Sequence, residues 1–70
     1  MTDRLRVETT DSEPHELGTI TLQPDGAVEC TPGARQVFAT MRRRWPSDAA
    51  LFDRLAQGWS NGPVRIVPAN

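Results

Sequence analysis

The 70-residue sequence contains no lysine and no tyrosine, only one cysteine and one histidine, and no long apolar run. A single cysteine excludes an internal disulfide, and no paired metal-ligand spacing is present. No stretch approaches the roughly 20 apolar residues of a membrane-spanning helix, and the N-terminal "MTDRLRVETT" is too polar for a secretory signal. We therefore expect a cytoplasmic protein, or a virion protein if the gene belongs to a phage, with no membrane partner.

The composition indicates one small, slightly acidic domain. All eight basic residues are arginine, and alanine and proline are plentiful, which is typical of a high-GC bacterial genome. The formal net charge is -1, whereas domains that bind nucleic acid usually carry a clear basic excess. A single domain, 1–70, buries only about 60% of its unfolded surface and is marginally stable alone. A partner or self-association can supply further stability.

The best-determined local structure is a hairpin in "LGTITLQPDGAVEC". Residues 24–26 are Pro-Asp-Gly, a turn in which proline presets φ and glycine takes a positive φ. The resulting register sets Leu22 opposite Val28 and Ile20 opposite Cys30, with all four on one face. Cys30 is therefore predicted to be a small buried residue and not a nucleophile, since no histidine is expected nearby to activate it.

Two helices are predicted after the hairpin, over about 32–45 and 48–57. Thr31 is the expected N-cap of the first helix, and Pro46 ends it. Ser47 is the expected N-cap of the second helix.

The fold predicted from these patterns is α+β, with a small antiparallel sheet covered by two helices. The strands are expected over about 4–9, 17–22, 27–30 and 63–67, and residues 10–16 form an acidic connector. Prolines flank the last strand and mark it as an edge, and the first strand is also interpreted as an edge. The side chains expected in the core are Val7, Leu17, Ile20, Leu22, Val28, Val37, Phe38, Met41, Trp45, Leu51, Phe52, Leu55, Trp59, Val64 and Ile66.

The segment "MRRRWPSD" contains three consecutive arginines. Helical spacing places Arg43 opposite the apolar stripe and Arg42 and Arg44 on its two flanks, whereas a recognition helix gathers its basic residues on one face. The run is therefore interpreted mainly as a helix end, where cations meet the helix dipole and free carbonyls. The alternative is a nucleic-acid-binding surface made of four arginines: Arg35, Arg42, Arg43 and Arg65.

No pattern indicates catalysis or a cofactor. His15 lies among Asp11, Glu13 and Glu16, but these residues occupy a connector without regular ligand spacing, so no metal site is predicted. The sequence has no glycine-rich phosphate loop, and its single histidine suits no catalytic triad. We therefore expect a protein that is not an enzyme and holds no cofactor or metal.

The two tryptophans are the strongest candidates for a binding surface. Trp45 ends the first predicted helix and Trp59 follows the end of the second, and at such positions a large ring either caps the core or serves as an exposed anchor for a partner. The segment "GWSNG" is predicted to be a turn that presents Trp59 and the amide of Asn61. Val7 would contribute through the first strand edge.

Residues 20–55, "ITLQPDGAVECTPGARQVFATMRRRWPSDAALFDRL", resemble PqqD-like domains, winged-helix modules that bind leader peptides in ribosomal-peptide maturation. Gly33 and Ala34 match a small-residue pair of that family, and Val37 and Phe38 match an aliphatic and an aromatic position. The resemblance departs at "NGPVRIVP", which is predicted as strand where the family has a further helix. It implies peptide binding at the edge of the first strand and against the second helix.

The leading hypothesis is a small non-catalytic protein- or peptide-interaction module, such as an adaptor or an accessory assembly subunit. Its partner would be a protein, a peptide or a second copy of the chain. One alternative is a winged-helix-like nucleic-acid-binding regulator. Another is a minor structural protein of a phage or mobile element.

Overall fold

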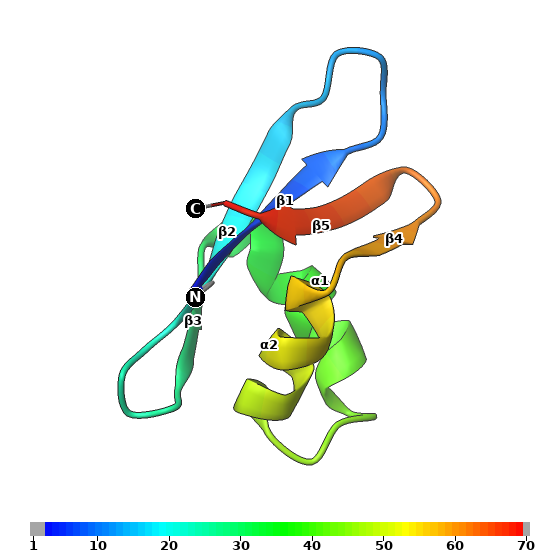
Figure 1. The fold of residues 1–70 in the computed structure, drawn as a ribbon. Coiled ribbons are helices and arrows are strands. Elements are labelled where there is room, and N and C mark those ends of the chain that lie inside the picture. Colours follow the sequence, from blue (N-terminus) through cyan, green and yellow to red (C-terminus); the bar gives the residue numbers. More distant parts are fainter. Residues whose placement is uncertain (1–2, 70) are drawn as a thin grey trace.

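A computed structural model describes residues 3–69 of the predicted domain 1–70 and arranges them as a sheet with two helices on one side (Figure 1). Within these residues the strands form one antiparallel sheet in the order β3-β2-β1-β5-β4. Helix α1 packs mainly on β2, and α2 packs mainly on β5. The predicted α+β class is therefore confirmed. The elements are β1 Arg4–Thr9, β2 Glu16–Leu22, β3 Val28–Cys30, α1 Pro32–Arg42, α2 Asp48–Ala56, β4 Trp59–Asn61 and β5 Val64–Pro68.

The strand order shows that two edge predictions are wrong. β1 lies between β2 and β5, and β5 lies between β1 and β4, so both are interior strands. Pro63 occupies the turn before β5 and Pro68 is the last residue of that strand, so neither proline interrupts the middle of a ladder. The two edges of the sheet are β3 and β4.

β4 is a strand where the sequence predicts a turn. It pairs with β5 through Trp59 opposite Ile66 and Asn61 opposite Val64. The chain reverses at the Gly62-Pro63 pair, and Gly62 has a φ of 60°, as the first central residue of a type II′ turn requires. The turn is therefore shorter than predicted and leaves "WSN" extended.

The β2–β3 hairpin has the predicted register. Ile20 lies opposite Cys30 and Leu22 lies opposite Val28, and Gly26 has the expected positive φ, 92°. This agreement follows because turn chemistry and the alternation of apolar residues specify the same pairing.

Helix α1 differs from its prediction at both ends. The Thr31 hydroxyl makes no capping bond but accepts a hydrogen bond of 2.9 Å from the Thr19 amide, which extends the β2–β3 ladder. The helix ends at Arg42 and not at residue 45. Pro46 explains the early end, because a residue before proline is disfavoured in the α conformation and the chain must leave the helix in advance.

Helix α2 starts and stops as predicted. The Ser47 hydroxyl accepts a hydrogen bond from the Ala50 amide at 3.1 Å. Gly58 follows the helix with a φ of 100°, the left-handed conformation that commonly terminates helices.

The start of α1 lies in direct contact with the β2 backbone. A β-carbon built on Gly33 would lie 1.8 Å from the carbonyl oxygen of Leu17, and one built on Gly18 would lie 2.7 Å from the amide nitrogen of Ala34. The two glycines thus allow helix and strand to approach more closely than side chains permit. This contact fixes where α1 crosses the sheet.

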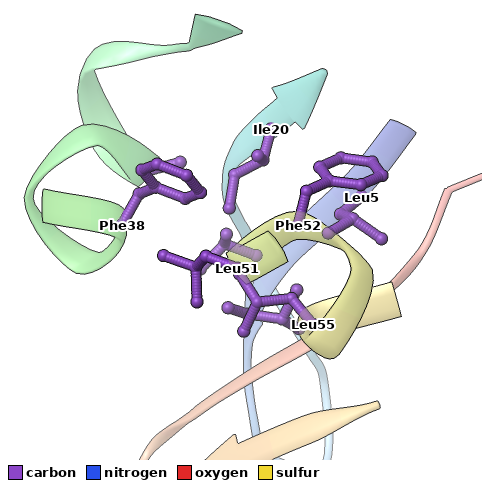
Figure 2. Close-up of a cluster of buried hydrophobic side chains, with 9 residues drawn as sticks. Leu5, Ile20, Phe38, Leu51, Phe52 and Leu55 are labelled. Atoms are coloured by element: carbon purple, nitrogen blue, oxygen red, sulfur yellow. The ribbon is translucent and has the colours of Figure 1, made fainter. Parts of the chain in front are cut away.

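The core lies between the sheet and the helices. In Figure 2, Phe38 of α1 and the side chains of α2 gather around residues of β1 and β2. Leu17 is predicted in this core but is 40% exposed, because it is the extra residue of a β-bulge, where Gly18 pairs with Val7 and Glu16 pairs with Glu8. The fully enclosed cluster is Leu5, Val7, Ile20, Ala34, Phe38, Leu51, Phe52, Leu55 and Ile66.

Candidate functional site

A groove of about 650 Å³ lies between α1 and the β4–β5 hairpin. Its apolar lining comes from α1 on one side and from the hairpin on the other, and most of these apolar side chains also pack against the core from outside. We call this feature the α1–β4 groove. Its lining residues are Gly33, Gln36, Val37, Thr40, Met41, Arg44, Trp59, Asn61 and Val64.

The periodicity of α1 explains which of its residues reach the groove. Gly33, Val37 and Met41 are separated by four positions each, so they lie along one side of α1. Arg44 follows three positions after Met41, in the turn beyond the end of the helix. This wall of the groove is therefore apolar along α1 and positively charged just after it.

Strand pleating explains the opposite wall. Trp59 pairs with Ile66, which is fully buried against the helices. Side chains directly opposite each other in an antiparallel pair project to the same face, so Trp59 lies on the helix-covered face, as does Asn61 two residues further on. Trp59 is half-buried in the groove wall.

β4 also gives the groove an unpaired backbone edge. It is the last strand of the sheet, and no other described strand pairs with its outer side. Its sequence, Trp-Ser-Asn, contains neither the charges nor the proline by which many edge strands prevent pairing. An incoming extended segment can therefore pair with β4 and place alternate side chains beside Trp59.

Arg44 is the one charged residue among those that line the groove. It is exposed, and within residues 3–69 its guanidinium makes no hydrogen bond or ion pair. Its neighbour Arg42 differs, because the Arg42 guanidinium bonds the carboxylate of Asp48 and donates to the carbonyl of Trp45 at 2.6 Å. The groove thus contains a cation that is available to a ligand.

The four residues predicted to bind protein occupy three different places. Trp59 and Asn61 line the α1–β4 groove. Trp45 lies half-buried in the connection between α1 and α2, outside the groove lining. Val7 is fully buried at the centre of the sheet, so it presents no edge to a partner.

The four arginines of the nucleic-acid alternative do not form one patch. Arg35 and Arg43 are exposed on and just after α1, while Arg42 is paired with Asp48. Arg65 lies on the sheet face opposite the helices, since its neighbour Ile66 is buried beneath them. The structure therefore separates Arg65 from the other three.

Glu8 is the one buried charged residue among those described, at 6% exposure. Its carboxylate accepts from the Arg65 Nε at 2.6 Å and from the Arg6 Nε at 3.1 Å. The hydrogen bond from Arg65 is the main cause that lowers the pKa of the Glu8 carboxyl below its ordinary value, and the two positive charges act in the same direction against the effect of burial. This cluster joins β1 to β5 on the open face of the sheet.

Substituting Glu8 by glutamine is expected to destabilise the protein near neutral pH and to have a smaller effect in acid. A lowered pKa in the folded state stabilises it at pH values above the unfolded pKa, about 4.3 for glutamate, and this stabilisation is lost as the pH falls through the folded pKa. Urea unfolding of wild type and Glu8→Gln at pH 7 and pH 3 measures the difference. If the free energies of unfolding of wild type and Glu8→Gln differed equally at pH 7 and pH 3, the assigned role of the carboxylate would be contradicted.

The described residues contain no group of three potential metal-ligating side chains. Cys30 lies on the core side of β3 and is half-buried, and burial raises the pKa of its thiol, an effect that the charge of Arg35 partly opposes. His15 lies in the β1–β2 connection, where its amide donates to the Thr9 hydroxyl at 2.9 Å. No helix among residues 3–69 is long and apolar enough to cross a membrane.

Sequence reasoning missed most of the groove because it assigned Val37, Met41 and Val64 to the core and Arg44 to a helix flank. A usable signal was present in "WSNGPVRI", where two alternating segments are separated by a Gly-Pro pair, a short hairpin pattern. Recognising β4 would have placed Trp59 on the helix-facing side of an edge strand.

In comparisons with known proteins, no family model matches the sequence and no curated protein or solved structure matches it. The resemblance of residues 20–55 to PqqD-like domains stays a prediction. The first strand that it implicates is interior in the sheet.

Proposed function

We propose that the protein is a non-catalytic interaction module that binds an extended peptide segment of a partner protein in the α1–β4 groove. The observation that carries this proposal is the position of Trp59, on an unpaired edge strand and in the wall of a partly apolar groove. Backbone pairing and side-chain recognition would then occur at the same place.

The physical basis is strand addition. A segment that pairs with β4 satisfies backbone groups that otherwise face water, and its alternate side chains enter the groove. β4 is only three residues long, so few backbone hydrogen bonds are available and side-chain contacts with Val37, Met41 and Trp59 must supply much of the affinity. A contact of this size belongs to the weak, transient class of interfaces, which suits an adaptor or an accessory assembly subunit in the cytoplasm.

The nucleic-acid alternative has less support, because two of its four arginines are held by carboxylates. A structural role in a phage particle rests on size and composition. A groove that offers apolar side chains, a strand edge and one free cation favours a peptide ligand over either.

Selection from a displayed library of random peptides tests the proposal. Wild type should enrich extended peptides that bind in the groove. Thr40→Trp should block the groove without changing its charge and weaken their binding at least about tenfold, a loss of about 1.4 kcal/mol. Thr40 and Ala39 are both exposed on α1, but only Thr40 lines the groove.

Ala39→Trp is the matched control, since it adds the same bulk at the neighbouring position of the helix and should leave binding unchanged. Circular dichroism checks that both variants are folded. The proposal fails if no peptide is enriched, or if Thr40→Trp and Ala39→Trp bind the selected peptides equally well.

A further inference from the structure

We infer that the α1–β4 groove selects a peptide segment with an acidic residue two positions from a large apolar residue. This inference rests on the proposed function and adds the chemistry of the ligand. It follows from the distribution of charge and of apolar side chains along the groove.

The acidic preference follows from Arg44. No carboxylate lines the groove, so an arginine at its wall has no competing partner there. Arginine pairs with a carboxylate through two parallel hydrogen bonds, stronger and more directional than bonds between neutral groups. The neighbouring Arg42 cannot take this role because Asp48 already occupies it.

The apolar preference follows from Val37, Met41, Trp59 and Val64. They come from both walls, and their side chains are half-buried, so each retains surface that a ligand can cover. Methionine adapts its shape to different partners, and a tryptophan ring provides a large rigid contact. One large apolar side chain between the walls would cover these surfaces together.

The spacing follows from the separation of Met41 and Arg44. Arg44 lies in the turn after α1, where its amide donates to the Met41 carbonyl at 3.1 Å, and three residues of such a turn rise about 6 Å. Two residues of an extended chain span about 6.6 Å, and side chains two positions apart project to the same side. An extended segment that follows this direction can therefore place an apolar side chain against Met41 and an acidic one at Arg44.

A charge-reversal selection tests the inference. The random peptide library is selected against wild type, Arg44→Glu and the control Arg43→Glu, which makes the same change of net charge at an exposed residue outside the groove lining. Wild type and Arg43→Glu should enrich aspartate or glutamate two positions from a large apolar residue. Arg44→Glu should enrich arginine or lysine at the acidic position.

Affinities measured with synthetic peptides make the comparison quantitative. Replacing the selected acidic residue by lysine should weaken binding to wild type at least about tenfold and should strengthen binding to Arg44→Glu, since reversing both charges restores the attraction. The inference is overturned if peptides depend on the groove, as judged by Thr40→Trp, yet show no acidic preference. Absence of any groove-dependent peptide overturns the proposed function instead.

A second copy of the chain is the competing occupant, since its own acidic connector could meet Arg44. Sedimentation of the purified protein at micromolar concentration distinguishes a second copy of the chain from a separate peptide as the occupant of the groove. A monomer, with or without Arg44→Glu, supports a separate peptide ligand. A dimer that Arg44→Glu dissociates would overturn the inference.

Discussion

Replacing Leu55 with alanine is expected to destabilise the protein by about 2–5 kcal/mol, the usual range for a leucine removed from a core. Leu55 is completely buried on α2, the helix that packs mainly on β5, and it lies in the cluster shown in Figure 2. A chain of this length has a total stability of only roughly 4–10 kcal/mol. The substitution therefore removes much of the stability of the fold.

Thermal and urea unfolding measure this loss, and the melting temperature should fall by roughly 10 °C or more. Leu17→Ala is the matched control, because Leu17 is 40% exposed and its truncation should change stability by less than about 0.5 kcal/mol. Equal effects at Leu17 and Leu55 would contradict the placement of the core.

Replacing Gly33 with alanine is expected to destabilise the protein by about 1–3 kcal/mol, the range for overpacking a close contact. Helix propensity alone would make the substitution stabilising, since alanine is favoured over glycine in helices by about 1 kcal/mol. The new β-carbon would lie 1.8 Å from the Leu17 carbonyl oxygen, a backbone atom of β2. Helix α1 would have to move away from the sheet, and its wall of the groove would move with it.

Gln36→Ala, one turn further along α1, is the control that separates the effect of helix propensity from the effect of the close contact at Gly33. Gln36 is exposed, so this variant should be as stable as wild type or slightly more stable. Chemical denaturation of the two variants gives the comparison. A Gly33→Ala protein more stable than wild type would show that the close contact between α1 and β2 is wrong.

The sequence was sufficient where two independent local signals agreed. For the β2–β3 hairpin, the Pro-Asp-Gly turn and the alternation around Ile20 and Leu22 predict one register, and the structure has it. For α2, Ser47 and Gly58 are local signals at the two ends, and both act as expected. Such features depend on neighbouring residues and hardly on the rest of the fold.

The position of each strand in the sheet could not be predicted in the same way. Whether β1 is central or at an edge depends on β5, whose partner residues lie more than 50 positions later in the chain. The prolines beside β5 were misleading because a proline in a turn or at a strand end removes no donor from the interior of the ladder. The residues of a segment therefore predict that it forms a strand better than they predict which strands lie beside it in the sheet.

The groove was missed for a related reason. Half-buried residues such as Val37 and Met41 fit a core stripe equally well whether or not another element covers them completely. Only the three-dimensional arrangement shows that the β4–β5 hairpin leaves space beside α1. The same arrangement assigns Arg44, and not the other arginines of its run, to the groove.

An extended peptide is expected to bind between α1 and β4. NMR measurement of intermolecular nuclear Overhauser effects, between isotope-labelled protein and an unlabelled peptide from the library selection, locates the bound peptide. The expected result is contacts from the peptide to the Trp59 ring and the Met41 methyl group, with slower hydrogen exchange in β4. Contacts confined to β3, or to the open face of the sheet around Glu8 and Arg65, would show that the peptide does not bind in the α1–β4 groove.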